Sequence, residues 1–368
     1  MQGSTCARRP AALPDEPDLI CPNCKGELTT RAHSLTCGAC GRDWPIEGGV
    51  PVLTESSTWY PKEHMTREQF EKFLRDVDLN GWERALETAI GGMAKPKTFR
   101  ALAFDETRRD LSHFLPVNGE SVVLDYGCGM GGISFGLARS CKRVCSIDQS
   151  LFRSRFIHER CKRAGVSNIT AICAGNSRYL PFPDESFDII VLNGVLEWMP
   201  LASDGDPREV QIAALREMNR VTRKGGVLYV SIENRFGYRY VMLGKGDSHN
   251  QEKRKLPYVT ALPRILADMY SRMAIGHPYR CYLYSYSGYR RMLLEANFSA
   301  CDFYFPYPDH NTLDFIVPLE DGAAAACSVE HILGNAALSR KERWALGLLK
   351  GTRLLKYLAQ DYSIIATK

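Results

Sequence analysis

Short apolar runs separated by helical stretches dominate residues 121–233. Five runs stand out, namely VVLDY, RVCSID, TAICAG, DIIVLN and VLYVSI. Runs of this length with few polar positions are typical of strands that are buried on both faces. The pattern predicts an α/β fold in which helices cover both sides of a mostly parallel sheet. The final segment, DYSIIATK, predicts one further strand that is antiparallel to its neighbours.

The periodicity changes before this region. Three segments space their apolar residues three and four apart, as on one face of a helix: REQFEKFLRDV, NGWERALETAI and TFRALAFDETRRDLSHFL. We expect residues 57–118 to form a helical linker and a cap over one mouth of a site in the main domain, residues 119–368.

Length and composition limit the organisation of the chain. At 368 residues and 45% hydrophobic content, it suits one large domain and one small satellite. The 47 basic residues nearly balance 42 acidic ones, so charge alone does not call for nucleic acid. No apolar run is long enough for a membrane span, and residues 1–18 predict a disordered lead-in without a secretory signal. We expect a cytoplasmic protein with reduced cysteines.

Four cysteines form a separate pattern. Cys21 and Cys24 form one pair, and twelve intervening residues separate it from a second pair, Cys37 and Cys40. Two CxxC pairs at this spacing predict a tetrahedral Zn(II) site, which is structural because four thiolates leave no open position. Residues 19–56 are therefore expected to be a small zinc ribbon. The closing stretch DWPIEGGVPVL resembles the tail of small zinc-ribbon proteins that activate partner methyltransferases, which implies a role in binding a protein partner or supporting the fold.

A glycine-rich turn follows the first apolar run. Gly127, Gly129 and Gly132 satisfy GxGxxG, which by itself fits several nucleotide cofactors. Asp125 favours S-adenosylmethionine, because a carboxylate two residues before the first glycine would repel a pyrophosphate and attract a sulfonium. Asp148 ends the second run, where an acid can accept hydrogen bonds from ribose hydroxyls.

Four motifs occur in the order LDYGCGMGG, SIDQS, AGNSRYLPFPDESFDIIVLNGVLEWMP and LREMNRVTRKGGVLYVSIENRFG. This set resembles the class I S-adenosylmethionine-dependent methyltransferases, over about 121–237. The resemblance implies a Rossmann-like sheet of seven mostly parallel strands. It also implies adenine contacts near residue 177 and a sulfonium or acceptor contact after the fourth strand. The expected cofactor residues are Asp125, Tyr126, Gly127, Gly129, Asp148, Gln149, Asn176, Ser177 and Asn193, with Tyr179 as a further adenine neighbour.

An insertion over residues 234–300 is the expected acceptor region. Tyr282, Tyr284 and Tyr286 alternate as on one strand face, either as stacking groups for an acceptor or as the edge of a sheet. Methyl transfer depends mainly on alignment, and a hydroxyl acceptor would add a need for a base. The candidate bases are His249, Glu233, Glu197 and His310.

Three functions are compatible with these patterns. The first is methylation of a small molecule, sugar or glycan intermediate, since 234–320 also resembles bacterial methyltransferases of glycan and specialised-metabolite pathways. The second is methylation of an RNA base, which a zinc module and the basic stretch RKERWALGLLKGTRLLKY would serve. The third is a binding module without turnover, which the retained Asp125, glycines and Asp148 disfavour.

Overall fold

The strands form one ladder, in the order β1-β2-β3-β4-β7-β6-β5-β8-β9-β12-β10-β11. The computed structural model describes residues 18–368 apart from 56–63, 94, 176, 203–204 and 247–255. Its strands are β1 (Leu28–Thr30), β2 (Ser34–Cys37), β3 (Asp43–Glu47), β4 (Val50–Leu53), β5 (Val122–Tyr126), β6 (Arg143–Asp148), β7 (Ile169–Ala174), β8 (Phe187–Asn193), β9 (Thr222–Glu233), β10 (Ala300–Asp309), β11 (Thr312–Pro318) and β12 (Asp361–Thr367).

The expected α/β sheet is confirmed, whereas its size and direction are corrected. The five apolar runs are β5–β9, and the last segment is β12, antiparallel to β9 as predicted. However, the sheet has twelve strands and is mixed, not seven and mostly parallel. Strands β4 to β9 pair in parallel, and the rest pair antiparallel. The extra strands come from the N-terminal segment at one edge and from the β10–β11 hairpin at the other.

Alternate residues of the parallel strands enter two different cores. Leu124, Ile190 and Leu228 pack with helices α6 (Pro207–Val221) and α9 (Tyr286–Glu295) on one face. Val123 and Ile189 pack on the other face with α4 (Gly132–Leu137), α5 (Leu151–Ala164) and the 3-10 helix η1 (Glu106–His113). Both faces of the sheet are therefore buried, as the apolar runs predicted.

The chain reverses its direction of travel across the sheet at β5. Strands β5, β6 and β7 follow one another toward one edge, and β8 then returns to the other side of β5. In open α/β sheets, ligands bind outside the carboxyl ends of the strands at such a switch point. The ends of β5 and β8 thus mark where a site is expected.

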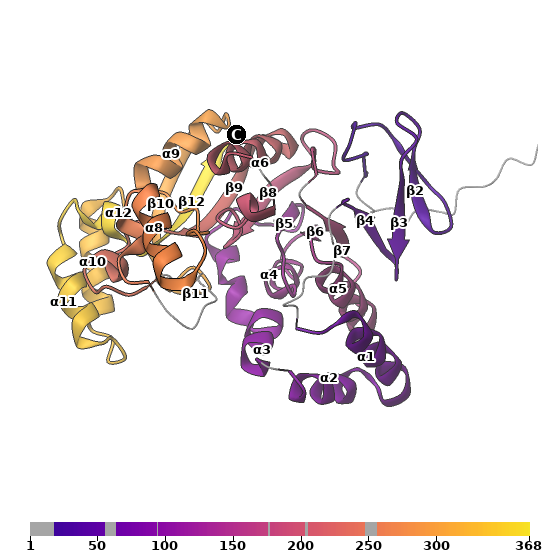
Figure 1. Cartoon of the computed structure of the whole chain (residues 1–368), viewed down its shortest axis with the longest axis horizontal. Helices are drawn as coiled ribbons and strands as arrows, with labels where there is room; N and C mark the ends of the chain where they lie inside the picture. The colour runs from indigo at the N-terminus through magenta and orange to yellow at the C-terminus, as the bar shows by residue number, and fades with distance from the viewer. Residues whose placement is uncertain (1–17, 56–63, 94, 176, 203–204, 247–255) are drawn as a thin grey trace, which may run out of the picture.

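Three helices cover this end of the sheet, and together they are called the cap. These are α1 (Arg67–Asn80), α2 (Trp82–Gly91) and α3 (Pro96–Phe104), which lie below the sheet in Figure 1. Their buried aromatic residues pack on α5: Phe70 meets Phe152 edge to face at 5.2 Å between ring centroids, and Phe99 meets Phe156 at 5.4 Å. The cap is therefore attached to the helix that follows β6.

The N-terminal strands extend the main sheet (Figure 1). Val52 and Leu53 of β4 pair in parallel with Cys173 and Ala174 of β7. Two backbone hydrogen bonds add to this junction, from Ile20 to the carbonyl of Pro181 at 3.1 Å and from Tyr179 to the carbonyl of Pro22 at 3.1 Å. The cysteine-bearing segment is thus joined to the loop that follows β7.

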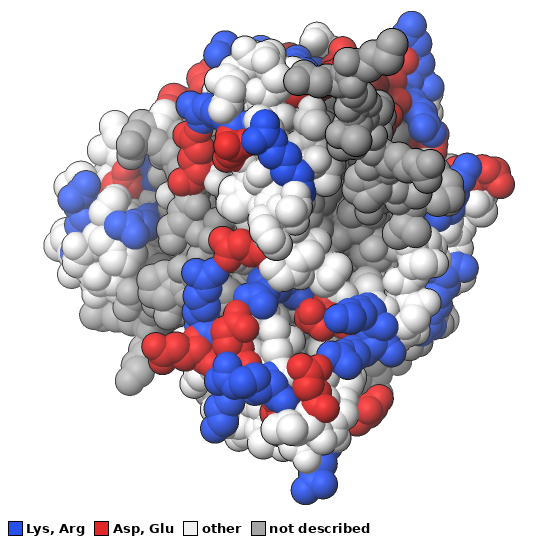
Figure 2. Space-filling model, turned by 90° about the vertical axis from the view of Figure 1, so that its right-hand side faces the viewer, with Lys and Arg blue, Asp and Glu red and all other residues white. Residues whose placement is uncertain are grey.

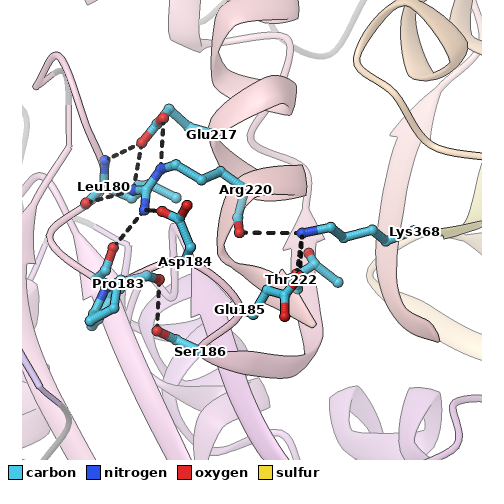
Figure 3. Close-up of polar contacts among 10 residues, drawn as sticks. Leu180, Pro183, Asp184, Glu185, Ser186, Glu217, Arg220, Thr222 and Lys368 are labelled. Carbon is cyan, nitrogen blue, oxygen red and sulfur yellow. Dashed lines mark hydrogen bonds and ion pairs between the residues drawn. The ribbon is translucent and has the colours of Figure 1, made fainter. Parts of the chain in front are cut away.

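An arginine network holds the same loop against α6 (Figure 3). The Arg220 guanidinium donates to the carboxylates of Glu217 and Asp184, at 2.8 Å each, and to the carbonyl of Leu180 at 3.0 Å. Glu217 also accepts the Leu180 N–H at 2.8 Å, and the Lys368 ammonium donates to the carbonyl of Thr222 at 2.7 Å. These charged groups fix the segment between β7 and β8 and the end of the chain.

The tyrosine-rich stretch is not a strand, which corrects one expectation. Residues 281–285 are irregular, and Tyr286 begins α9 because the Ser285 hydroxyl caps it by accepting the N–H of Gly288. The alternating tyrosines therefore belong to a loop that leads directly into a helix. The remaining helices are η2 (Met199–Ala202), α7 (Tyr238–Val241), η3 (Val259–Ala261), α8 (Arg264–Ile275), α10 (Gly322–Leu333), α11 (Arg340–Leu349) and α12 (Leu355–Leu358).

In the described part of the chain, no helix is both long enough and apolar enough to cross a bilayer.

Candidate functional site

A cavity of about 430 Å³ opens at the carboxyl ends of β5, β8 and β9. This volume lies within the range of small-molecule sites. The glycine-rich turn forms one wall, and His64 and Leu102 from the capping region form another. A second, wider hollow is lined by α10 residues such as Cys327 and His331 and does not include the strand ends.

Four backbone amides of the glycine-rich turn donate within the protein. The N–H groups of Gly127 and Cys128 donate to the carbonyl of Ile147 at 2.8 and 3.1 Å. The N–H of Gly129 donates to the Asp148 carboxylate at 3.0 Å, and that of Gly131 to the carbonyl of Cys128 at 2.9 Å. Phosphate-binding turns present such amides to the ligand. This turn instead presents glycine backbone whose N–H groups are engaged elsewhere.

Two predicted acids lie on either side of this turn. Asp125 lines the cavity, is 2% exposed and accepts the Ser134 hydroxyl at 2.5 Å. Asp148 lies behind the turn, where it accepts the N–H groups of Gly129 and Ser150 and pairs with Arg153 at 3.4 Å. Of the two carboxylates, only Asp125 is part of the cavity wall.

Three predicted residues form the opposite part of the wall. Asn193 ends β8, Glu197 follows it, and Glu233 ends β9. The side-chain oxygen of Asn193 is buried and has no hydrogen-bond partner among the described residues. Glu233 accepts the Tyr240 hydroxyl at 2.6 Å. The structure therefore brings together predicted cofactor residues and two predicted base candidates.

His310 completes the wall at the turn between β10 and β11. Its Nδ1 lies 3.0 Å from Oδ2 of Asp361, and its backbone N–H donates to the same oxygen at 2.9 Å. Burial lowers the pKa of the imidazole, but the hydrogen bond to Asp361 and the charges of Asp361, Glu233 and Glu197 outweigh it and raise the pKa to about 9. The buried carboxylates thus favour the imidazolium form of His310.

The other predicted cofactor residues that the structure describes are not in the cavity wall. Tyr126 is half-buried, and burial together with the charge of Asp148 raises its pKa to about 12. The Ser177 hydroxyl donates to the carbonyl of Leu53 in β4 at 3.0 Å. Gln149 follows Asp148 and packs beside Gly175. Asn176 and His249 lie outside the described residues.

Some cavity residues were missed. His64 lies in the segment before α1, and Arg153 lies on the first turn of α5. Neither carries a motif, and only the packing of the cap brings His64 to the strand ends. Asp361, which lies next to the wall, was missed as well. It is the first residue of an expected antiparallel strand and pairs with Glu233.

The four predicted zinc ligands are gathered at one point. The sulfurs of Cys21 and Cys40 are 3.7 Å apart, those of Cys24 and Cys37 are 3.5 Å apart, and all four lie within 4.8 Å of one another. A tetrahedron with Zn–S bonds of about 2.3 Å places its sulfurs about 3.8 Å apart. The arrangement is therefore compatible with a zinc site.

Comparison with known proteins shows a partial similarity to one family. Residues 124–230, from within β5 through β8 and most of β9, match the family model described as "Methyltransferase domain". This part of the chain is similar to methyltransferase domains. The match begins just before Asp125 and covers the glycine-rich turn, Asp148 and Asn193, so the matched region includes most of the cavity wall.

Three relatives illustrate the similarity. Demethylmenaquinone methyltransferase from Geobacillus stearothermophilus is 30% identical over 36% of this chain and 55% of its own length. Sterol 24-C-methyltransferase from Candida albicans is 25% identical over 66% of this chain and 58% of its own length. The chain thus spans little more than half of either relative. A solved complex of the Haloferax volcanii Trm112 methyltransferase activator with a methyltransferase is 15% identical, with a TM-score of 0.40, over 80% of this chain and 97% of that one.

Proposed function

We propose that this protein transfers a methyl group from S-adenosylmethionine to a small molecule. The observation that carries the proposal is Asp125, whose buried side chain lines the cavity beside the glycine-rich turn, where four backbone amides donate within the protein. A cofactor with a pyrophosphate would meet an unfavourable charge there. A cationic sulfonium is suited to the carboxylates of this wall.

Different residues in and around the cavity are proposed to contact different groups of the cofactor. Gly127 and Gly129 let the cofactor approach the backbone, and Asp125 and Asn193 offer side-chain oxygens at the cavity wall. Asp148 holds the turn through the Gly129 amide, and we propose that its ribose contact forms when Arg153 moves aside. Tyr126, Gln149, Ser177 and Asn176 remain proposed neighbours of the ribose and adenine.

The bound cofactor supplies a methyl carbon that its sulfonium has already activated. The protein then has to align the acceptor with this carbon and keep water out. His64 and Leu102 close the cavity from the side of the cap, and Glu197, Glu233 and His310 line the part nearest β8 and β9. We place the acceptor among these last three side chains.

A small acceptor fits this cavity better than a nucleic acid. The two curated relatives are named for demethylmenaquinone and a sterol, both small molecules. A sugar or glycan intermediate remains within the same proposal. RNA methylation is the second candidate, but on the face that carries the N-terminal strands basic side chains are interspersed with acidic ones (Figure 2). An RNA-binding surface would gather basic side chains.

We also propose that residues 19–56 are a zinc ribbon, with Cys21, Cys24, Cys37 and Cys40 binding one Zn(II). The sulfur spacing supports four-thiolate coordination, and a closed site of this kind stabilises a fold without taking part in the reaction. Because β4 pairs with β7, the ion would support the loop next to the cofactor. In this respect the ribbon would act as an activator that is part of the same chain.

The test of the proposed function is label transfer. Full-length protein is incubated with methyl-labelled S-adenosylmethionine and a bacterial extract separated into RNA, lipid and small polar fractions. Label in the lipid or small polar fraction is the expected result. Label in RNA alone would favour the second candidate, and cofactor binding without label in any fraction would favour a binding module.

A further inference from the structure

Resting on the proposed function, we propose that His310, oriented by Asp361, is the group that takes the proton from a hydroxyl-bearing acceptor. Neither the family match nor the glycine-rich motifs include these two residues, because both lie beyond residue 230. They reach the cavity only through the pairing of the last strands. The proposal therefore names both a catalytic residue and the chemical class of the acceptor.

The sheet brings the pair to the site. Asp361 starts β12 and pairs with Glu233 at the end of β9, so its carboxylate lies at the same edge as the cavity. The β10–β11 turn places His310 over it, with hydrogen bonds from both the backbone N–H and Nδ1 to one carboxylate oxygen. Two contacts to one oxygen fix the plane of the ring, and Asp361 is 2% exposed. Asp361 is thus a positioning residue.

The other ring nitrogen is directed to the cavity side. A Cβ placed on Gly194, which lines the cavity after β8, would lie 3.2 Å from Nε2 of His310. The Asn311 amide is 3.0 Å from the same nitrogen and belongs to the cavity wall. With Nδ1 engaged by Asp361, Nε2 is the nitrogen that an acceptor bound beside Gly194 would meet.

Charged groups around the ring set its proton affinity. Asp361 faces it from β12, Glu233 from β9 and Glu197 from the segment after β8, and all three favour the imidazolium. Arg239 of α7 interacts electrostatically with the Asp361 carboxylate. A sulfonium in the cavity would oppose protonation further, because two positive charges would share a small volume. Cofactor binding should therefore lower the pKa of His310 and prepare it to accept a proton.

The proposed step balances as follows. The acceptor oxygen forms a bond to the methyl carbon as the S–C bond breaks and its electron pair returns to sulfur. The hydroxyl proton moves to Nε2, and its bonding electrons remain on oxygen. The resulting imidazolium is stabilised by Asp361 and later loses its proton to water.

Nuclear magnetic resonance tests the pair without requiring turnover. The full chain, labelled in its histidine rings, is titrated from pH 5 to 10 alone, with S-adenosylmethionine and with S-adenosylhomocysteine. H310Q assigns the signal, and H113Q, which alters an exposed histidine of η1, is the control. We expect the pKa of His310 to be raised in the wild type, and we expect D361N to lower it by at least one pH unit. We also expect the cationic ligand to lower it further than the neutral thioether does.

Kinetics supplies the second measurement, with the extract fraction that takes up label as acceptor. H310Q should reduce kcat by about 10²- to 10⁴-fold, while calorimetry shows no loss of cofactor affinity. D361N should move the rising limb of the pH–rate profile to lower pH. An ordinary His310 pKa that neither D361N nor the ligands change, or an H310Q enzyme with full kcat, would overturn the dyad alone. Failure of the wild type to bind either ligand would overturn the proposed function as well.

Discussion

Gly127 turns the chain out of β5 with a φ of 73°, in the left-handed region that residues with a Cβ avoid. A Cβ at this position would also lie 2.4 Å from Cγ2 of Val195. Backbone conformation and close approach therefore both require glycine here.

We expect G127A to lower the free energy of unfolding by about 2–4 kcal/mol, since it adds backbone strain to overpacking. Urea unfolding of the single variant, of V195A and of the double variant separates the two causes. The double variant should recover the overpacking part and retain about 1–2 kcal/mol of loss from the left-handed φ. Full recovery would mean that the backbone conformation is not strained.

His310 gives the fold a pH dependence with a definite sign. Its pKa is raised from 6.5 to about 9 in the folded chain, so its contribution to stability is complete below about pH 6.5 and is lost as pH rises through about 9. The shift corresponds to roughly 3 kcal/mol at most. We expect the free energy of unfolding to fall over this interval, and H310Q to flatten the fall. Equal slopes in the two proteins would refute a raised pKa.

Among the elements, β4 couples the cysteine cluster to the parallel sheet. It carries the chain from the ribbon strands into the sheet beside β7, and the Ser177 hydroxyl donates to its last carbonyl. Because β4 pairs with β3 on one side and with β7 on the other, loosening of the ribbon would reach the loop after β7. Metal content should therefore influence the cofactor side of the molecule.

We expect C37S to lose about one zinc ion per chain, to lower Tm by several degrees and to weaken cofactor binding, because Cys37 is buried in the proposed site. Elemental analysis, thermal unfolding and calorimetry measure these three effects. C327S, which alters an exposed cysteine of α10, is the matched control and should change none of them. A variant without zinc but with full stability and affinity would show that the ribbon is independent of the site.

At the scale of the whole molecule, local patterns and long-range pairing differed in how well the sequence predicted them. The buried runs of β5–β9 follow from periodicity, which neighbouring residues determine. The extension of the sheet by β4 and by the β10–β11 hairpin depends on pairing between distant segments, and residue patterns do not encode it directly.

The residues of the site divide in the same way, into those that local motifs predicted and those that only distant packing or pairing brings to the cavity. Asp125, Gly127, Gly129, Asn193, Glu197 and Glu233 were predicted from motifs and strand ends, and all of them line the cavity. Asp361 was missed because its place depends on the register between β9 and β12. His64 and Arg153 enter the wall through the packing of the cap and of α5, which leaves no motif in the sequence.

The central claim is that the cavity beside Asp125 binds a cationic, phosphate-free cofactor. Calorimetric titration of the full chain with S-adenosylmethionine, S-adenosylhomocysteine and NADH tests it most directly. We expect the two sulfur ligands to bind with a stoichiometry of about one, D125N to weaken S-adenosylmethionine more than the neutral thioether, and NADH to give no binding heat. Binding of NADH in the absence of binding by either sulfur ligand would contradict the account.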